Sequence, residues 1–172
     1  PVLKESLTST LLYIDFSKSR FNLSGSSFAQ ALNKLGGETP EVKDAGYFRL
    51  CFEALQYLIN KGMILAGHDI SAGGLITALL EMTFSHNSIG MDLNLDDLGE
   101  KDIIRLLFSE KPGVVIQVND LDFTSIYLHE KGIKYSVIGK PVAGKELKIS
   151  HNQEEFQFDI HSLRDKWFRT SY

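Results

Sequence analysis

The sequence predicts an α+β fold, a sandwich in which helices pack on a mixed sheet. Two observations favour it over a regular parallel α/β fold. Predicted strands and helices alternate irregularly, and a hairpin at residues 146–149 and 155–158 comes late in the chain. The 172 residues are 43% hydrophobic and 10% aromatic, which suits one globular domain over residues 1–172 and not a disordered chain. Residues 1–9 carry no pattern and are expected to be a linker or a cut end.

The first predicted elements are one strand and two helices. Residues 11–16 are apolar, partly β-branched and partly aromatic, which favours a strand. A loop rich in Ser and Gly leads to a short helix at residues 28–32. A longer helix is predicted between Asp44, a suitable N-cap, and Gly62. An apolar stripe at helical spacing predicts its core face. That stripe consists of Phe48, Phe52, Leu55 and Ile59, widened by Cys51 and Leu58.

A buried strand and a buried helix are predicted next. The wholly apolar residues 63–66 are typical of a buried strand. Residues 75–84 carry apolar side chains on two faces, which indicates a deeply buried helix. Apolar and polar residues alternate over residues 91–95, which favours a half-exposed strand, and residues 103–108 favour a helix.

The last third is predicted to contain more strand than helix. Residues 114–118 form the strongest strand pattern in the chain, because they are apolar, β-branched and preceded by Pro-Gly. A helix is predicted at residues 121–131, a strand at 135–138 and, after the hairpin, a closing helix at 160–168. The predicted turns after the strand contain Gly139, Pro141 and Gly144.

Charge and cysteine content exclude several classes of function. Eighteen basic residues against 22 acidic residues give a net charge of −4, which is not the footprint of a nucleic-acid or anionic-membrane binder. The single cysteine, Cys51, cannot form an intramolecular disulfide, so a reducing compartment such as the cytoplasm is expected. No apolar run approaches the roughly 20 residues that span a bilayer.

The negative charge is concentrated in residues 86–102. We favour a solvated loop that leads into a helix, with Asp96 or Asp97 near the N-terminus of that helix. The alternative is a metal cluster, although the spacing matches no calcium loop. The acidic residues are Asp92, Asp96, Asp97, Glu100 and Asp102, against the one base Lys101.

Residues 67–74 (GHDISAGG), between a predicted strand and a predicted helix, form the candidate site. Gly73 and Gly74 let the backbone approach a ligand closely, and the N–H groups at the start of the helix suit a phosphate. The Ser71 hydroxyl can donate to a phosphate oxygen. Asp69 suits Mg²⁺, which takes carboxylate oxygens together with nucleotide phosphates.

Each of these residues also has a structural interpretation. Ser71 or Asp69 can cap the following helix, and the two glycines can serve only a tight turn. His68 is more often a hydrogen-bonded structural histidine than a ligand. The Ser-rich residues 24–27 before the short helix present the same choice, and ordinary capping is favoured there. P-loop spacing and histidine spacing for a metal are absent.

Four segments carry a family resemblance. They are residues 23–30 (LSGSSFAQ), 68–75 (HDISAGGL), 80–82 (LEM) and 108–118 (FSEKPGVVIQV). In this order they resemble the formylglycinamidine ribonucleotide synthetase (phosphoribosylformylglycinamidine synthase) family, in its large single-chain form. The match falls on the C-terminal-type subdomain of the second aminoimidazole-ribonucleotide-synthetase-like half. It covers about residues 10–170.

The resemblance implies a domain of a multidomain ligase of purine biosynthesis. The family uses ATP and glutamine to convert formylglycinamide ribonucleotide to the amidine, with ammonia from a glutaminase domain. The second half holds an auxiliary nucleotide, ATP or ADP, with Mg²⁺. At matching positions, Asp69 is implied to bind Mg²⁺, and Ser71 with Gly73 and Gly74 to bind the nucleotide. No catalytic residue is implied in this chain.

The implied partners are the other domains of the same polypeptide: the first synthetase-like half, the nucleotide-binding subdomain and the glutaminase domain. Without them the chain is expected to be inactive. Residue 1 is Pro and not Met, as expected for a piece of a longer protein. Ala72 replaces an Asp that is frequent in the family, and Ser24 replaces a Gly.

Two other hypotheses stay open. The chain can be a domain of another enzyme of the superfamily, such as aminoimidazole ribonucleotide synthetase or a selenophosphate synthetase relative. It can also be a purely structural domain that braces an internal pseudo-dimer and binds nothing.

Overall fold

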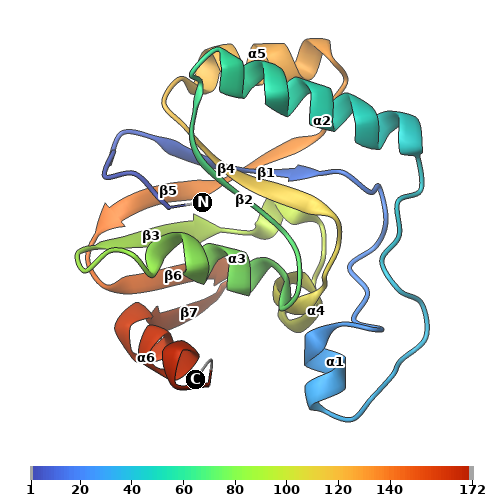
Figure 1. Cartoon of the computed structure of the whole chain (residues 1–172), viewed down its shortest axis with the longest axis vertical. Coiled ribbons are helices and arrows are strands. Elements are labelled where there is room, and N and C mark those ends of the chain that lie inside the picture. The colour runs from blue at the N-terminus through green and yellow to red at the C-terminus, as the bar shows by residue number, and fades with distance from the viewer. Residues whose placement is uncertain (1, 171–172) are drawn as a thin grey trace.

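Seven strands form one mixed sheet in the computed structural model, which describes residues 2–170. The strands are β1 (Thr10–Asp15), β2 (Ile64–Asp69), β3 (Ile89–Asn94), β4 (Gly113–Val118), β5 (Tyr135–Ala143), β6 (Glu146–His151) and β7 (Glu154–Asp159). Their order in the sheet is β2-β4-β1-β5-β3-β6-β7 (Figure 1). All neighbours are antiparallel except β3 and β6, which pair parallel. The predicted α+β class, with helices packed on a mixed sheet, is confirmed.

Helices cover both faces of the sheet. They are α1 (Ser27–Ala31), α2 (Ala45–Asn60), α3 (Gly74–Thr83), α4 (Ile103–Phe108), α5 (Leu121–Glu130) and α6 (Ile160–Thr170), with a short 3-10 helix η1 (Asp96–Leu98). Leu12 and Ile14 of β1 share one core with α2 and α5, whereas Leu11 and Tyr13 share the other with α3 and α4. This division follows from the alternation of side chains along a strand. No helix within residues 2–170 has the length and apolarity needed to cross a membrane.

The buried face of α2 differs from the predicted stripe. Asp44 caps the helix as expected, because its Oδ1 accepts a hydrogen bond from the N–H of Tyr47. However, Phe52 and Ile59 of the predicted stripe are each 52% exposed. The buried face consists of Tyr47, Cys51, Ala54 and Leu58. Two adjacent apolar rows recur at helical spacing, so periodicity alone could not decide which row meets the sheet.

Two strands also differ from prediction. β2 extends to Asp69 at the edge of the sheet, where it is half-buried and not fully buried. β5 runs through Gly139 and Pro141, which the sequence placed in turns. Gly139 lies at a register shift between β1 and β5. Pro141 lies past the end of the β1 pairing, where β5 has only β3 as a neighbour, and such a strand tolerates proline.

The acidic residues within residues 86–102 have separate structural roles. Asp96 and Asp97 are exposed, which confirms the solvated segment, but they lie in the first turn of the 3-10 helix η1 and not at the start of α4. Asp102 is the N-cap of α4, and its Oδ1 accepts the N–H of Ile104 at 2.9 Å. Asp96 instead accepts the backbone N–H of Asn152 at 2.7 Å. Within residues 2–170, no group of three or more His, Cys, Asp or Glu side chains is arranged to hold a metal ion.

The segment before β1 packs on the domain. Leu3 is fully buried, and its N–H donates to the carbonyl of Met82 at 2.9 Å. The buried side chain of Gln117, on β4, hydrogen-bonds both the N–H and the carbonyl of Lys4, and also the hydroxyl of Ser9. This part of the expected linker therefore contributes to the core.

Candidate functional site

β2 ends in the loop that the sequence marks as the candidate site. The N–H of Ile70 donates to the carbonyl of Gly113 at 2.9 Å, which extends the β2–β4 pairing by one residue. The Asp69 side chain is 79% exposed, and Ser71 is also exposed. Apart from a 3.8 Å approach of His68 Nδ1 to the Asp69 carboxylate, neither side chain has a partner among residues 2–170. Both are therefore free to meet a ligand.

His68 has the structural role considered from the sequence. Its Nε2 lies 2.8 Å from Oε2 of Glu81, on α3, and its Nδ1 lies 2.7 Å from the carbonyl oxygen of Asp69. The ring thereby joins the end of β2 to α3 and holds the backbone from which the Asp69 side chain projects.

The start of α3 explains the glycine pair. Gly73 has φ of 89° and Gly74 has φ of 76°, both in the left-handed region. A Cβ on Gly74 would lie 2.6 Å from the carbonyl oxygen of Leu107 and 2.8 Å from the backbone of Phe108. The backbone of α3 therefore begins directly against the end of α4. Gly73 is the N-cap and no side chain caps the helix, so the capping interpretation is wrong for both polar side chains of the loop.

Glu110 joins the two loops rich in Gly and Ser. Its Oε1 accepts the N–H of Ser27 at 2.7 Å and the N–H of Gly73 at 2.9 Å, across 83 and 37 residues of sequence. We refer to these two hydrogen bonds as the Glu110 bridge. The bridge brings together three of the segments that carry the family resemblance, residues 23–30, 68–75 and 108–118.

The hydrogen bonds of the bridge lower the pKa of Glu110. Partial burial alone would raise the pKa of this carboxyl group, but the N–H groups of Ser27 and Gly73 and the hydroxyl of Ser27 outweigh it. The net pKa lies below the ordinary value of 4.5. The carboxylate is therefore charged at neutral pH and places negative charge at the start of α3, where the helix dipole favours it. It also occupies the Gly73 N–H, one of the groups expected to meet a phosphate.

Removing the charge of Glu110 is expected to weaken the fold and change its response to acid. Glu110→Ala should lower the free energy of unfolding by about 2 kcal/mol at pH 7, and Glu110→Gln, which keeps an acceptor oxygen, by about 1 kcal/mol. Because folding lowers the pKa of Glu110, its stabilising contribution is complete above pH 4.5 and is lost as the pH falls through the folded-state pKa. Urea unfolding at pH 3 to 7 measures both effects.

Glu155→Gln is the matched control, because Glu155 is an exposed carboxylate on β7. The control should follow the acid dependence of the unmodified chain, whereas Glu110→Gln should show a smaller loss of stability below pH 4.5. Identical curves for the two variants would contradict the bridge.

The Ser-rich loop before α1 contains an ordinary cap. Ser26 Oγ accepts the N–H of Ala29 at 3.2 Å, which confirms the favoured interpretation of residues 24–27. The sequence did not reveal the role of Glu110. Its only signal was the position of an acidic residue within residues 108–118, and the partners of that residue are distant in sequence.

The exposed oxygens of the loop fit part of a magnesium site. Mg²⁺ is commonly held by one or two carboxylates and completes its shell with waters and phosphate oxygens. The carboxylate of Asp69 and the hydroxyl of Ser71 have this hard-oxygen chemistry. Since no cluster of three metal-binding side chains exists within residues 2–170, the remaining ligands would come from outside this part of the chain.

The whole candidate site falls inside a known family. The family described as AIR synthase related protein, C-terminal domain, matches residues 16–152. A similar curated protein is the probable phosphoribosylformylglycinamidine synthase, chloroplastic/mitochondrial, of Arabidopsis thaliana, which is 34% identical over 169 residues. That match covers 94% of this chain but only 12% of the relative.

Solved structures share the fold. PurL of Thermotoga maritima in complex with ATP matches with a TM-score of 0.71 and 12% identity, over 95% of this chain and 27% of that chain. The same protein in complex with FGAR matches with a TM-score of 0.74 and 15% identity, over 95% of this chain and 29% of that chain. The family match extends from the end of β1 through the Glu110 bridge to the β6–β7 turn, and this chain belongs to the AIR synthase related protein, C-terminal domain family.

Proposed function

We propose that the chain is one domain of a phosphoribosylformylglycinamidine synthase, a ligase of purine biosynthesis. The name of the Arabidopsis thaliana relative and the family match support this proposal. The chain spans 12% of the length of that relative, so the activity would belong to a longer polypeptide. In that polypeptide, ATP and glutamine would be used to convert formylglycinamide ribonucleotide to the amidine. The compartment would be the cytoplasm.

In this proposal the domain does not act alone. Its partners are the first synthetase-like half, a nucleotide-binding subdomain and a glutaminase domain of the same polypeptide. The isolated chain would have no ligase activity and at most weak nucleotide affinity.

The proposed role of the β2–α3 loop is to contribute to an auxiliary nucleotide site. The observation that carries this role is the exposure of two polar side chains that the rest of the described chain leaves without hydrogen-bond partners, Asp69 and Ser71. Asp69 would contact Mg²⁺ and Ser71 would donate its hydroxyl to a phosphate of ATP or ADP. Because Gly73 and Gly74 have no side chains, they would let the nucleotide approach the backbone of the loop closely. Bound Mg²⁺ would neutralise phosphate charge.

The rigidity of the loop supports this role. His68 fixes the backbone of Asp69 through Glu81, and the Glu110 bridge fixes the N–H of Gly73. The two exposed side chains therefore project from a backbone that is held on both sides. A site of this kind loses little conformational entropy when it binds a ligand.

A structural domain without ligand is the second candidate. The observation in its favour is that the glycine pair is explained within the chain, because Gly74 packs on the backbone of α4 and the Gly73 N–H already has an acceptor. A domain of another superfamily enzyme is a third. The coding sequence that surrounds this chain would separate the third candidate from the first, because only the first requires a glutaminase domain.

Nucleotide binding is expected to depend on Asp69 and Ser71. Titration of the chain with MgADP, followed by NMR, should shift the amide signals of the β2–α3 loop. Asp69→Ala should weaken the affinity by about tenfold, the equivalent of one lost charge-assisted contact. Ser71→Ala should weaken it less. Neither variant should change the melting temperature in the absence of nucleotide, because neither side chain contributes a hydrogen bond to the fold.

Asp122→Ala is the matched control, since Asp122 is an exposed carboxylate on α5. Repeating the titration with a polypeptide in which the nucleotide-binding subdomain precedes this chain should raise the affinity. Equal MgADP affinity for Asp69→Ala and Asp122→Ala in that longer polypeptide would reject the nucleotide site and favour the structural domain.

A further inference from the structure

A polar cavity lies at the same end of the strands as the β2–α3 loop, beyond β4 and β1 in the sheet. It has a volume of about 610 Å³ and lies between the end of β1, the start of β5 and η1. It shares no residue with the β2–α3 loop. The charged and polar side chains that line it include Asp15, Lys111, His129, Lys134 and Ser136. Its size is within the range of small-molecule sites.

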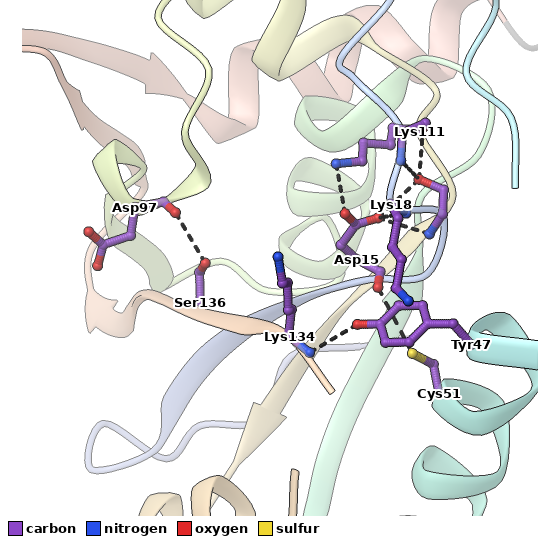
Figure 2. Close-up of polar contacts among 10 residues, drawn as sticks. Asp15, Lys18, Tyr47, Cys51, Asp97, Lys111, Lys134 and Ser136 are labelled. Carbon is purple, nitrogen blue, oxygen red and sulfur yellow. Dashed lines mark hydrogen bonds and ion pairs between the residues drawn. The ribbon is translucent and has the colours of Figure 1, made fainter. Parts of the chain in front are cut away.

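A buried ion pair forms one wall of this cavity. Lys111 Nζ lies 2.9 Å from Asp15 Oδ2, and the Lys111 side chain is only 7% exposed (Figure 2). The other oxygen of Asp15 accepts the N–H and the hydroxyl of Ser17 and the N–H of Lys18. The negative charge of Asp15 is therefore already well compensated. The Lys111 ammonium also lies 4.2 Å from the centre of the Phe21 ring, but no second carboxylate contacts it within residues 2–170.

Lys134 adds a positive charge that the described chain does not neutralise. Its backbone N–H donates to the hydroxyl of Tyr47 at 2.9 Å, which fixes the start of β5. Its side chain rises from that strand into the space between Ser136 and Asp15 (Figure 2). Across residues 2–170, its ammonium group has neither an ion pair nor a hydrogen bond. A lysine whose backbone is held in place and whose ammonium group is unpaired can bind an anionic ligand.

The nearest remaining carboxylate does not oppose these lysines. The backbone carbonyl of Asp97 accepts the hydroxyl of Ser136 at 3.4 Å, and its carboxylate points away from Lys134 (Figure 2). His129, in the last turn of α5, also lines the cavity. Asp15 is already held by Lys111, Ser17 and Lys18, and the Asp97 carboxylate points away, so the ammonium group of Lys134 is the charge left uncompensated at the cavity, which favours an anion.

Tyr13, one of the lining residues, has a buried hydroxyl without a partner within residues 2–170. Tyr13 is 3% exposed, and its Oη has no hydrogen-bond partner within residues 2–170. Burial, and secondarily the charge of Asp15, raise the pKa of this phenol far above its ordinary value, so it keeps its proton. Its burial keeps this hydroxyl out of reach of an ion in the cavity, so the lysines are the groups that can meet one.

We propose that this cavity is an oxyanion site, which takes the phosphate or carboxylate group of a small molecule between the ammonium groups of Lys111 and Lys134. A lysine acts as a point charge and can bind either group, whereas the planar fork of an arginine binds carboxylates and phosphates with two parallel hydrogen bonds. This site is independent of the nucleotide site proposed for Asp69 and Ser71.

Inorganic phosphate and acetate are the two test ligands. Each is titrated into the full chain at constant ionic strength, with chloride as the balancing anion, and the amide signals of residues 111–113 and 134–136 are followed by NMR. Saturable shifts with either anion are expected, and the stronger binder identifies the preferred group. Lys134→Met should weaken that binding by about fivefold, the effect of one partly exposed charge pair.

Lys101→Met is the matched control, because Lys101 is exposed and lies outside the cavity. It should bind like the unmodified chain, as should Asp69→Ala, which affects only the nucleotide site. Absence of saturable shifts with both anions, or equal binding by Lys134→Met and Lys101→Met, would overturn the proposal.

Discussion

Replacing Gly74 with alanine is expected to lower the free energy of unfolding by about 3 kcal/mol. Two costs add. The residue has φ of 76°, which an L side chain adopts with strain, and its Cβ would lie 2.6 Å from the carbonyl oxygen of Leu107. The opposing atoms belong to the backbone of α4, so they cannot move aside as the end of a flexible side chain would. Urea unfolding followed by circular dichroism measures the loss.

Gly62→Ala separates the two costs. Gly62 has φ of 68°, close to that of Gly74, but a Cβ at Gly62 would have no atom within 4 Å. The control should therefore lose only about 1 kcal/mol, the backbone part of the effect. If both variants lost the same amount, the close packing of α3 on α4 would not be the reason for glycine at position 74.

Replacing Lys111 with methionine should also destabilise the chain by about 3 kcal/mol. Methionine preserves the apolar stem against Phe21 but leaves the carboxylate of Asp15, whose side chain is 20% exposed, without its cation. Breaking a buried pair from one side is costly because the remaining charge stays poorly solvated. The hydrogen bonds from Ser17 and Lys18 to Asp15 keep the effect at the lower end of the range for such pairs.

Two further variants test the cause of that loss. Asp15→Asn in the Lys111→Met background removes the unpaired charge and should recover part of the stability. Arg49→Gln removes an exposed pair with Glu53, in which the arginine side chain is 80% exposed, and should leave unfolding nearly unchanged. A Lys111→Met variant as stable as Arg49→Gln would show that the buried pair has no structural role.

The sequence predicted the elements of the fold better than their faces. The alternation of residues 91–95 and the apolar residues 114–118 led to the correct strands, β3 and β4, because short-range patterns determine them. In α2 the sequence offered two neighbouring apolar rows. The sheet selects the row that contains Cys51 and Leu58, and Phe52 and Ile59 of the other row remain exposed.

The candidate site was also only partly predictable from the sequence. The position of Asp69 and Ser71 at the exposed end of β2 followed from local signals, a short apolar run and a glycine pair. The Glu110 bridge did not, because it joins backbone N–H groups to a side chain 83 and 37 residues away. No local sequence pattern encodes which N–H groups a given carboxylate will contact. The two hydrogen bonds of Glu110 are therefore evident only in the folded structure.

The position of β1 in the sheet has a consequence for synthesis of the chain. Among the described strands β1 is made first, yet its neighbours are β4 and β5, so that Thr10 pairs with Val118 and Leu11 with Gly139. Translation at roughly 5–20 residues per second leaves several seconds during which both neighbours are missing. The apolar residues of β1 are therefore unpaired on the ribosome while the middle of the chain is made. A nascent chain that stops before β4 exposes this segment to aggregation and to chaperones, although most of its helices are already encoded.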